Sequence, residues 1–283
     1  MPSANSTWFL LDSGAGAPAF NMALDEALLE AMSRLGKPVL RFYGWTEPAA
    51  TFGYFQKYAD VERATPLRPL IRRPTGGGIV PHDADWTYSL VFPPGHEWHS
   101  LKAEESYRRV HEWIQAAFAM LDMVTELASA RKNPIAASGS SRRLPGHSRT
   151  KAGEEAPFSN AECGVRNAES SQSLLTSAAT DQCFIGHEKS DLLWKGGKIA
   201  GAAQRRNKLG LLIQGSIQPP PFQKSEVRSQ KSERAAWQDA MRDAGRAVLG
   251  ADCQEFGLDA PLRERVEFLT RQKYSQDAYN HKR

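Results

Sequence analysis

The chain has 283 residues, 41% of them hydrophobic and 24% charged, and a formal net charge of +4. This composition is ordinary for a globular protein, and the mild positive charge permits an acidic protein partner without indicating nucleic-acid binding. No apolar run approaches the roughly 18 residues of a membrane helix, and Trp8–Leu11 is too short for a signal-peptide core. The three cysteines are widely spaced, which argues against a disulfide framework, so we expect a cytoplasmic protein.

The first half of the chain predicts helices and strands of an α/β protein. Apolar side chains recur at helical spacing over residues 20–34 and again over residues 105–130. Runs rich in β-branched and aromatic residues predict three strands between these helices, at residues 39–43, 50–55 and 87–92.

Residues 133–180 break this pattern. They are rich in Ser, Ala, Gly and charged residues, and Phe158 is their only Phe, Tyr or Trp. Such a segment cannot bury enough apolar surface to offset the entropy lost on ordering. We therefore predict a disordered insertion at 133–180 within a single domain that spans residues 1–283.

Regular structure is predicted to resume near residue 182. The sequence Lys-Gly-Gly-Lys at 195–198 lies between two apolar segments and predicts a hairpin turn. Residues 209–217 predict a further strand. The apolar spacing over 225–249 and 261–272 predicts two amphipathic helices.

The most informative stretch is residues 72–83, which read Arg-Arg-Pro-Thr-Gly-Gly-Gly-Ile-Val-Pro-His-Asp. Three consecutive glycines let a backbone approach a bound group closely, and the arginines offer donors for a carboxylate or phosphate. The spacing is neither that of a dinucleotide-binding fingerprint nor that of a Walker loop. A bare triple glycine is equally compatible with a surface turn, but the flanking strands favour a loop within a sheet.

Cys183 and Lys198 are the residues to weigh as a reactive pair. A thiolate is the reactive form of cysteine, and a nearby ammonium group lowers the thiol pKa. Acyl transfer from a thioester to an amine can proceed through a cysteine acyl-enzyme. The two residues lie across one hairpin arm and its turn, so their side chains could meet. On residue type alone, a small buried cysteine and a solvated lysine are the simpler interpretations.

Histidines supply two further candidates. His82 can be read as a general base or as a structural hydrogen-bonding residue. His96 and His99 are three residues apart and lack the spacing of the H-E-x-x-H zinc motif, so no metal site is predicted there.

The glycine-rich stretch resembles the signature of the lipoate–protein ligase and octanoyltransferase family, which is related to biotin–protein ligases. Residues 21–28 resemble the family's first helix, residues 197–206 its lysine motif, and Lys273-Tyr274-Ser275 with Asn280 its C-terminal end. The resemblance covers most of residues 8–132 and 181–283. It implies a mixed, mostly antiparallel sheet with flanking helices and, since few residues follow the lysine motif, no C-terminal accessory domain.

The resemblance also implies roles for individual residues. Cys183-Phe184 matches the Cys-Phe of the cysteine-dependent octanoyltransferases, whereas ATP-dependent ligases generally need no such cysteine. Lys198 matches the motif lysine, which would hold the acyl carbonyl or, in a ligase, the adenylate. The residues expected to bind substrate are Arg73, Thr75, Gly76, Gly77, Gly78, His82, Gly201, Ala202 and Gln204.

Two positions depart from the family pattern. Ala202 stands where serine is usual, and Gln214 stands where many members have a histidine. The second departure leaves position 214 without an expected role.

The function expected from this resemblance is a protein acyltransferase without a cofactor. It would move an octanoyl or lipoyl group from an acyl-carrier-protein thioester to a lysine of a lipoyl-domain protein, of the glycine cleavage H protein or 2-oxoacid dehydrogenase E2 type. The alternative is an ATP-dependent lipoate–protein ligase, which would require ATP and Mg²⁺. A third alternative is a non-catalytic protein that binds lipoyl domains or acyl carriers; Cys183 and Lys198 argue against it.

Overall fold

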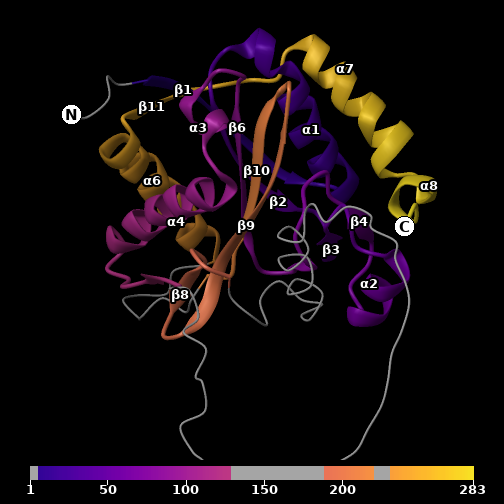
Figure 1. Ribbon diagram of the computed structural model, residues 1–283, viewed down its shortest axis with the longest axis horizontal. Helices are drawn as coiled ribbons and strands as arrows, with labels where there is room; N and C mark the ends of the chain where they lie inside the picture. Colours follow the sequence, from indigo (N-terminus) through magenta and orange to yellow (C-terminus); the bar gives the residue numbers. More distant parts are fainter. Residues whose placement is uncertain (1–5, 129–187, 220–229) are drawn as a thin grey trace, which may run out of the picture. The chain divides into compact units, whose positions relative to one another are not determined.

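The computed structural model describes residues 6–128, 188–219 and 230–283 (Figure 1), which belong to one compact unit. The predicted insertion at 133–180 lies outside the described residues, so this prediction and the single-domain organisation remain predictions. Cys163 and Cys183 also lie outside them.

A mixed sheet of eight strands forms the centre of the described unit. Strand β1 is parallel to both of its neighbours, and all other neighbouring strands are antiparallel. The mostly antiparallel sheet predicted from the sequence is therefore confirmed. In spatial order the strands are β11 (Ala251–Glu255), β1 (Ser6–Gly16), β2 (Val39–Trp45), β6 (Trp86–Phe92), β10 (Gly210–Ile217), β9 (Gly197–Asn207), β8 (Leu192–Trp194) and β7 (Glu126–Leu127).

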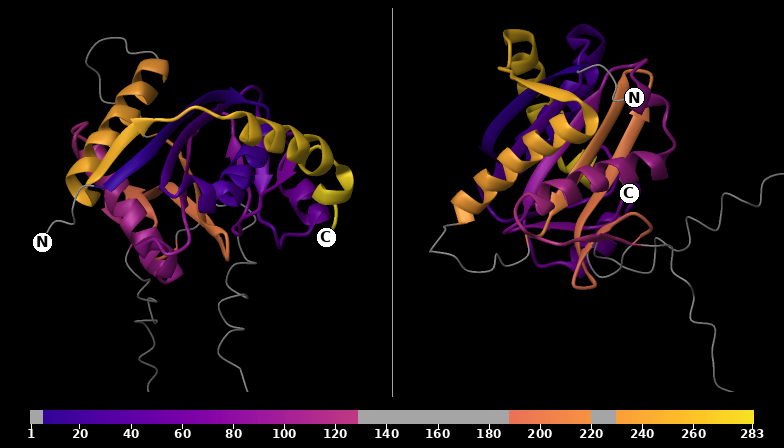
Figure 2. Two further views of the ribbon diagram at one scale, coloured as in Figure 1. Left: turned by 90° about the horizontal axis from the view of Figure 1, so that it is seen from above. Right: turned by 90° about the vertical axis from the view of Figure 1, so that its left-hand side faces the viewer.

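Helices cover both faces of this sheet (Figures 1 and 2). On one face, α4 (Ala103–Ala119) and α6 (Gln230–Leu249) pack against a core that includes Leu90 of β6. On the other face, α1 (Pro18–Leu35) and α7 (Ala260–Leu269) pack against a core that includes Val91. Adjacent residues of β6 thus point to opposite cores, as the alternation of side chains along a strand requires.

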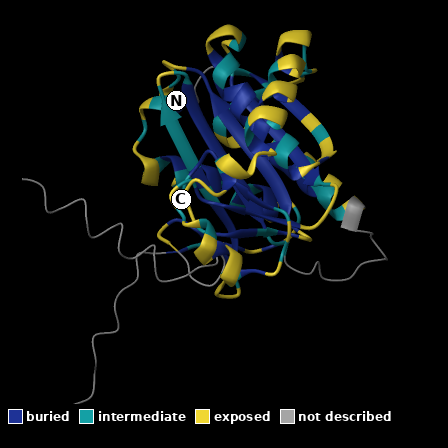
Figure 3. Ribbon diagram, turned by 90° about the vertical axis from the view of Figure 1, so that its right-hand side faces the viewer, coloured by how far each residue is buried: buried dark blue, intermediate teal, exposed yellow. Residues whose placement is uncertain are grey.

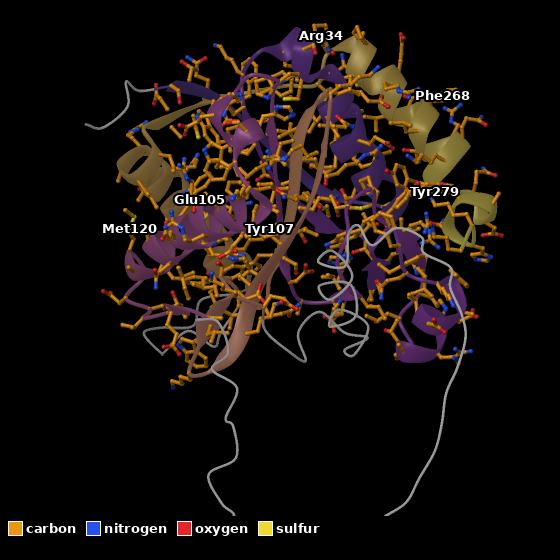
Figure 4. The ribbon with its side chains drawn as sticks, in the orientation of Figure 1. Arg34, Glu105, Tyr107, Met120, Phe268 and Tyr279 are labelled. Atoms are coloured by element: carbon orange, nitrogen blue, oxygen red, sulfur yellow. The ribbon has the colours of Figure 1, made fainter. Side chains whose placement is uncertain are left out.

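Burial on both faces explains why the central strands read as continuous apolar runs. Every residue of β6 and β10 is buried, and the yellow exposed positions in Figure 3 lie mostly on the helices and turns. Two large apolar side chains, Met120 and Phe268, are not buried in either core and remain half-exposed at the surface (Figure 4).

A second, three-stranded sheet carries the glycine-rich loop. Its order is β4 (Leu70–Arg72), β3 (Ala49–Phe52) and β5 (Val80–His82), with β3 parallel to β4 and antiparallel to β5. Residues 73–79 connect β4 to β5, so the loop does lie among strands. Helix α2 (Tyr58–Ala64) packs beside this sheet through Val61.

Short helical segments complete the described chain. They are α3 (Glu97–Ser100), a π-helical turn at Thr270–Tyr274 and α8 (Asp277–Asn280). None of the helices in the described ranges combines the length and the apolarity that crossing a bilayer would require.

Two predicted elements can be compared closely with the structure. Lys195 and Gly196, with φ of 49° and 79°, turn β8 directly into β9, which confirms the predicted hairpin. The helix predicted over 105–130 is too long, because α4 ends at Ala119. Asp122 there adopts a left-handed φ of 59° that stops the helix, and residues 126–127 instead pair with β8.

Candidate active site

Both arginines of the glycine-rich loop are held by carbonyl groups of the protein itself. Arg73 donates to the carbonyl oxygen of Thr51 at 2.9 Å, and to those of Gly76 and Gly78 at 2.9 and 2.8 Å. Arg72 donates to the carbonyl oxygens of Tyr54 and Gln56 and is fully buried. These contacts give the guanidinium groups a role in shaping the loop.

The loop approaches β3 so closely that one position requires glycine. A Cβ atom at Gly53 would lie 1.9 Å from the carbonyl oxygen of Gly77, which itself has a φ of +88°. Neither backbone segment could move away without breaking the arginine contacts. Gly53, just after β3, therefore allows the close packing of the loop against this strand.

We expect Gly53→Ala to lower the free energy of unfolding by about 3 kcal/mol, because backbone must be displaced to accommodate the methyl group. Urea denaturation measures this change. Gly76→Ala is the matched control: a Cβ atom there meets nothing within 4 Å, so the change should stay within about 0.5 kcal/mol. Equal effects of the two substitutions would contradict this account of the loop.

Hydrogen bonds engage both ring nitrogens of His82. Its Nε2 atom lies 2.7 Å from Thr51 Oγ1, which also accepts from Arg73 at 3.0 Å. The Nδ1 atom lies 2.8 Å from Asp85 Oδ2. The ring also stacks on Trp45, with centroids 3.8 Å apart. Since both ring nitrogens are engaged, the geometry favours the structural interpretation of His82 over the general base.

Asp85 joins the end of the loop to the large sheet. Its Oδ2 atom also accepts from Thr87 Oγ1 at 3.0 Å and from Ser216 Oγ at 2.7 Å. The side chain is almost entirely buried. This carboxylate therefore ties His82 to β6 and β10 together.

A second buried network supports the loop from helix α1. Asp25 and Arg41 form an ion pair of 2.6 Å in which both side chains have 0% exposure. Gln214 donates to Asp25 Oδ2 at 2.7 Å and accepts from Thr75 Oγ1 at 2.7 Å. The glutamine that departs from the family pattern thus connects the loop to the ion pair.

A cavity lies between the glycine-rich loop and the large sheet. Of the predicted site residues, Arg73, His82, Gly201 and Ala202 line it, whereas Thr75, Gly76, Gly77, Gly78 and Gln204 do not. The apolar part of the wall comes from α1, β2, β5 and β9. The remaining lining residues are Met22, Tyr43, Thr51, Val80, Thr87, Ala203, Gln214, Gly215 and Ser216.

Lys198 is buried next to this cavity. Its Nζ atom lies 2.7 Å from Asp191 Oδ2, and the two side chains are only 6% and 9% exposed. A Cβ atom at Gly201 would lie 3.1 Å from the same Nζ atom, and Gly201 lines the cavity. The ammonium group therefore lies close to the cavity wall, and the interpretation of Lys198 as a solvated surface lysine is wrong.

The other candidates from the sequence have structural roles or lie outside the described residues. Burial raises the pKa of the Cys253 thiol in β11, which disfavours the reactive thiolate. His96 accepts from the backbone N–H of Trp98 at the start of α3, and His99 Nε2 lies 2.9 Å from the carbonyl oxygen of Asn207. The structure does not describe Cys183, so its proximity to Lys198 stays a prediction.

The C-terminal residues singled out in the sequence support the loop from outside. Asn280 Oδ1 accepts from the backbone N–H of Arg72 at 2.9 Å, and its carbonyl oxygen accepts from the Arg72 guanidinium at 2.7 Å. Lys273 and Tyr274 both contact Glu26 Oε2 on α1, at 2.5 and 2.8 Å. The last helix, the loop and α1 are thereby joined.

Comparison with known proteins identifies the family. Residues 17–143 match the model of the lipoyl protein ligase A/B catalytic domain. The chain is 30% identical to octanoyltransferase LipM of Geobacillus kaustophilus, over 99% of this chain and 100% of that protein. The chain belongs to the LipM octanoyltransferase family. Octanoyltransferase LipM of Bacillus subtilis is 28% identical over 98% of this chain and 99% of its own length.

Membership in the LipM family makes the chain an acyltransferase. Among solved structures, a lipoate protein ligase of Thermoplasma acidophilum with bound lipoic acid has a TM-score of 0.62. That alignment covers 99% of this chain and 100% of the ligase at 17% identity, so it shows a shared fold.

The sequence of this LipM-family chain did not lead us to three residues near the site, Asp25, Arg41 and Asp191. The first two carried a signal, a charged residue within an apolar helix face and within an apolar strand.

Proposed function

We propose that this LipM-family protein transfers an octanoyl group from an acyl-carrier-protein thioester to a lysine of a lipoyl-domain protein. The observation that carries the proposal is the buried Lys198 ammonium next to a partly apolar cavity. A positive charge held away from water stabilises the negative charge that develops on an attacked carbonyl oxygen. Neither a solvated lysine nor an apolar cavity alone would support acyl transfer in this way.

Part of the cavity wall is apolar and suits the alkyl portion of an acyl group. Met22, Val80 and Ala203 offer apolar surface, and burying each methylene group contributes about 0.8 kcal/mol. The polar lining groups Thr51 and His82 are already paired with each other. An alkyl chain would therefore displace no hydrogen bond that the protein makes.

We assign the nucleophile to Cys183, on the resemblance to cysteine-dependent octanoyltransferases. Its thiolate would attack the thioester carbonyl, form a new thioester bond and release the carrier thiol. The amine of the acceptor lysine would then attack the carbonyl of this acyl-enzyme. The amine nitrogen would lose a proton as the amide forms, and the cysteine would leave and be regenerated as a thiol. Lys198 would stabilise the oxyanion in both steps. Neither step requires ATP or Mg²⁺.

The proposal is tested by supplying the two possible acyl donors separately. With octanoyl carrier protein and no ATP, the protein should octanoylate a lipoyl domain, of glycine cleavage H protein or E2 type. With octanoate, ATP and Mg²⁺, it should not. Intact-mass spectrometry of the lipoyl domain measures both reactions. Modification that depends on ATP would support the ligase alternative instead, and a domain that stays unmodified in both would support the binding protein.

A further inference from the structure

Asp191 is fixed from three directions beside Lys198. Its backbone carbonyl accepts from the N–H of Ala128 at 2.7 Å, and its Oδ2 atom accepts from the N–H of Glu188 at 2.7 Å. The preceding carbonyl, of Ser190, is hydrogen-bonded to His111 of α4. The carboxylate that contacts the Lys198 ammonium thus has little freedom to move.

The position of the ammonium group also depends on a glycine. A Cβ atom at Gly201 would lie 2.9 Å from Cε and 3.1 Å from Nζ of Lys198, and 3.8 Å from Asp191 Oδ1. The absence of a side chain at residue 201 leaves the space in which the ion pair lies. Since Gly201 also lines the cavity, the ion pair lies close to the cavity wall.

The groups that face the pair from neighbouring elements are neutral. Burial lowers the pKa of His111 on α4, against the opposing effect of the Asp191 charge. Burial raises the pKa of Tyr88 on β6, and the Asp191 charge adds to that shift. Lys189, two residues before Asp191, is exposed and paired with the exposed Glu104. Among the described residues, the Asp191 carboxylate is a negative charge placed directly against the lysine.

A buried ion pair is a poor source of stability, because removing two charges from water costs nearly as much as their attraction returns. Its placement at the acyl cavity calls for another reason. We propose that Asp191 is a positioning residue for acyl transfer, whose carboxylate holds the Lys198 ammonium at the cavity wall. This inference rests on the role proposed above for Lys198.

The test is the pH dependence of octanoyl transfer in Asp191→Asn. The amide keeps the size of the side chain but removes its charge, so the buried ammonium loses the counter-ion that favours its charged form. The alkaline limb of the kcat profile should move to lower pH by about one unit or more. Near pH 8, kcat should fall by about tenfold or more, with KM for the carrier protein little changed. A purely structural role would lower activity without moving this limb.

Two further variants make the result decisive. Asp191→Glu keeps the charge on a longer side chain, so it should retain the wild-type alkaline limb while kcat falls, because the ammonium is displaced. Glu104→Gln makes the same acid-to-amide change in the exposed pair with Lys189, and should leave both kcat and the limb unchanged.

Distinct outcomes separate this inference from the proposed function. An Asp191→Asn protein with an unmoved alkaline limb overturns the positioning role, whatever its kcat. If that variant does not fold, Asp191→Glu decides, and a wild-type kcat there overturns the inference. Lys198→Met should be inactive at every pH. Full activity of Lys198→Met would instead show that Lys198 takes no part in the mechanism. The role proposed for Lys198 and the positioning role of Asp191 would then both be wrong.

Discussion

Cys183→Ala should abolish both the octanoyl adduct on the protein and the transfer of octanoyl groups to the lipoyl domain. Without the sulfur there is no atom to carry the acyl group between the two substrates, and loss of a catalytic nucleophile costs about 10⁴-fold or more in rate. Incubation with octanoyl carrier protein, followed by intact-mass spectrometry, detects the adduct in the wild-type protein. Hydroxylamine should remove it, because thioesters are cleaved by this reagent.

Cys253→Ala is the control for this experiment. Burial raises the pKa of the Cys253 thiol, so it should carry no octanoyl group, and its loss should leave transfer intact. A fully active Cys183→Ala protein would remove the acyl-enzyme from the mechanism. Transfer would then have to proceed directly between the two substrates or through an adenylate.

Arg41→Met should lower the free energy of unfolding by about 3–5 kcal/mol, because it leaves the Asp25 carboxylate buried without its counter-ion. Both side chains have 0% exposure, so water cannot replace the lost contact. Arg41 also donates to Asn21 and Ser13, and these acceptors lose their partner too. Urea denaturation, followed by tryptophan fluorescence, measures the change.

Arg34→Met is the matched control, since Arg34 pairs with Asp259 at a site where the side chains are 50% and 41% exposed. Its loss should cost no more than about 1 kcal/mol. Replacing both partners, in Arg41→Met with Asp25→Leu, should be less harmful than Arg41→Met alone, because no unpaired charge remains. A double variant less stable than the single one would contradict this explanation.

The sequence predicted the long, periodic elements well. Helix α1 and strands β2, β6 and β10 fall where apolar spacing and β-branched residues indicated. Strands β5 and β11 were missed for physical reasons. β5 is three residues long and contains Pro81, and β11 contains Asp252 and Glu255, whose residue types are depleted in strands. These strands exist because neighbouring strands supply their hydrogen bonds.

The sequence predicted which residues lie near the candidate site better than it predicted what those residues contact. The glycine-rich loop and Lys198 were found from sequence, but the acceptors of Arg72 and Arg73 come from β3, the loop itself and the last helix. Likewise, nothing in the sequence indicated that Asp191 meets Lys198, because their contact depends on the two-residue turn that folds β8 onto β9. Spacing predicts which residues share an element, and tertiary contacts decide what they bind.

The hydrogen bonds between Arg72 and Asn280 have a consequence for the folding of the chain during its synthesis. Arg72 begins the glycine-rich loop in the first third of the chain, yet its backbone N–H and guanidinium bind a residue 208 positions later. A nascent chain on the ribosome can form α1 and the central strands while this partner is still unmade. The loop gains its full set of contacts only when synthesis has passed Asn280, so the candidate site is completed late in the synthesis of each chain.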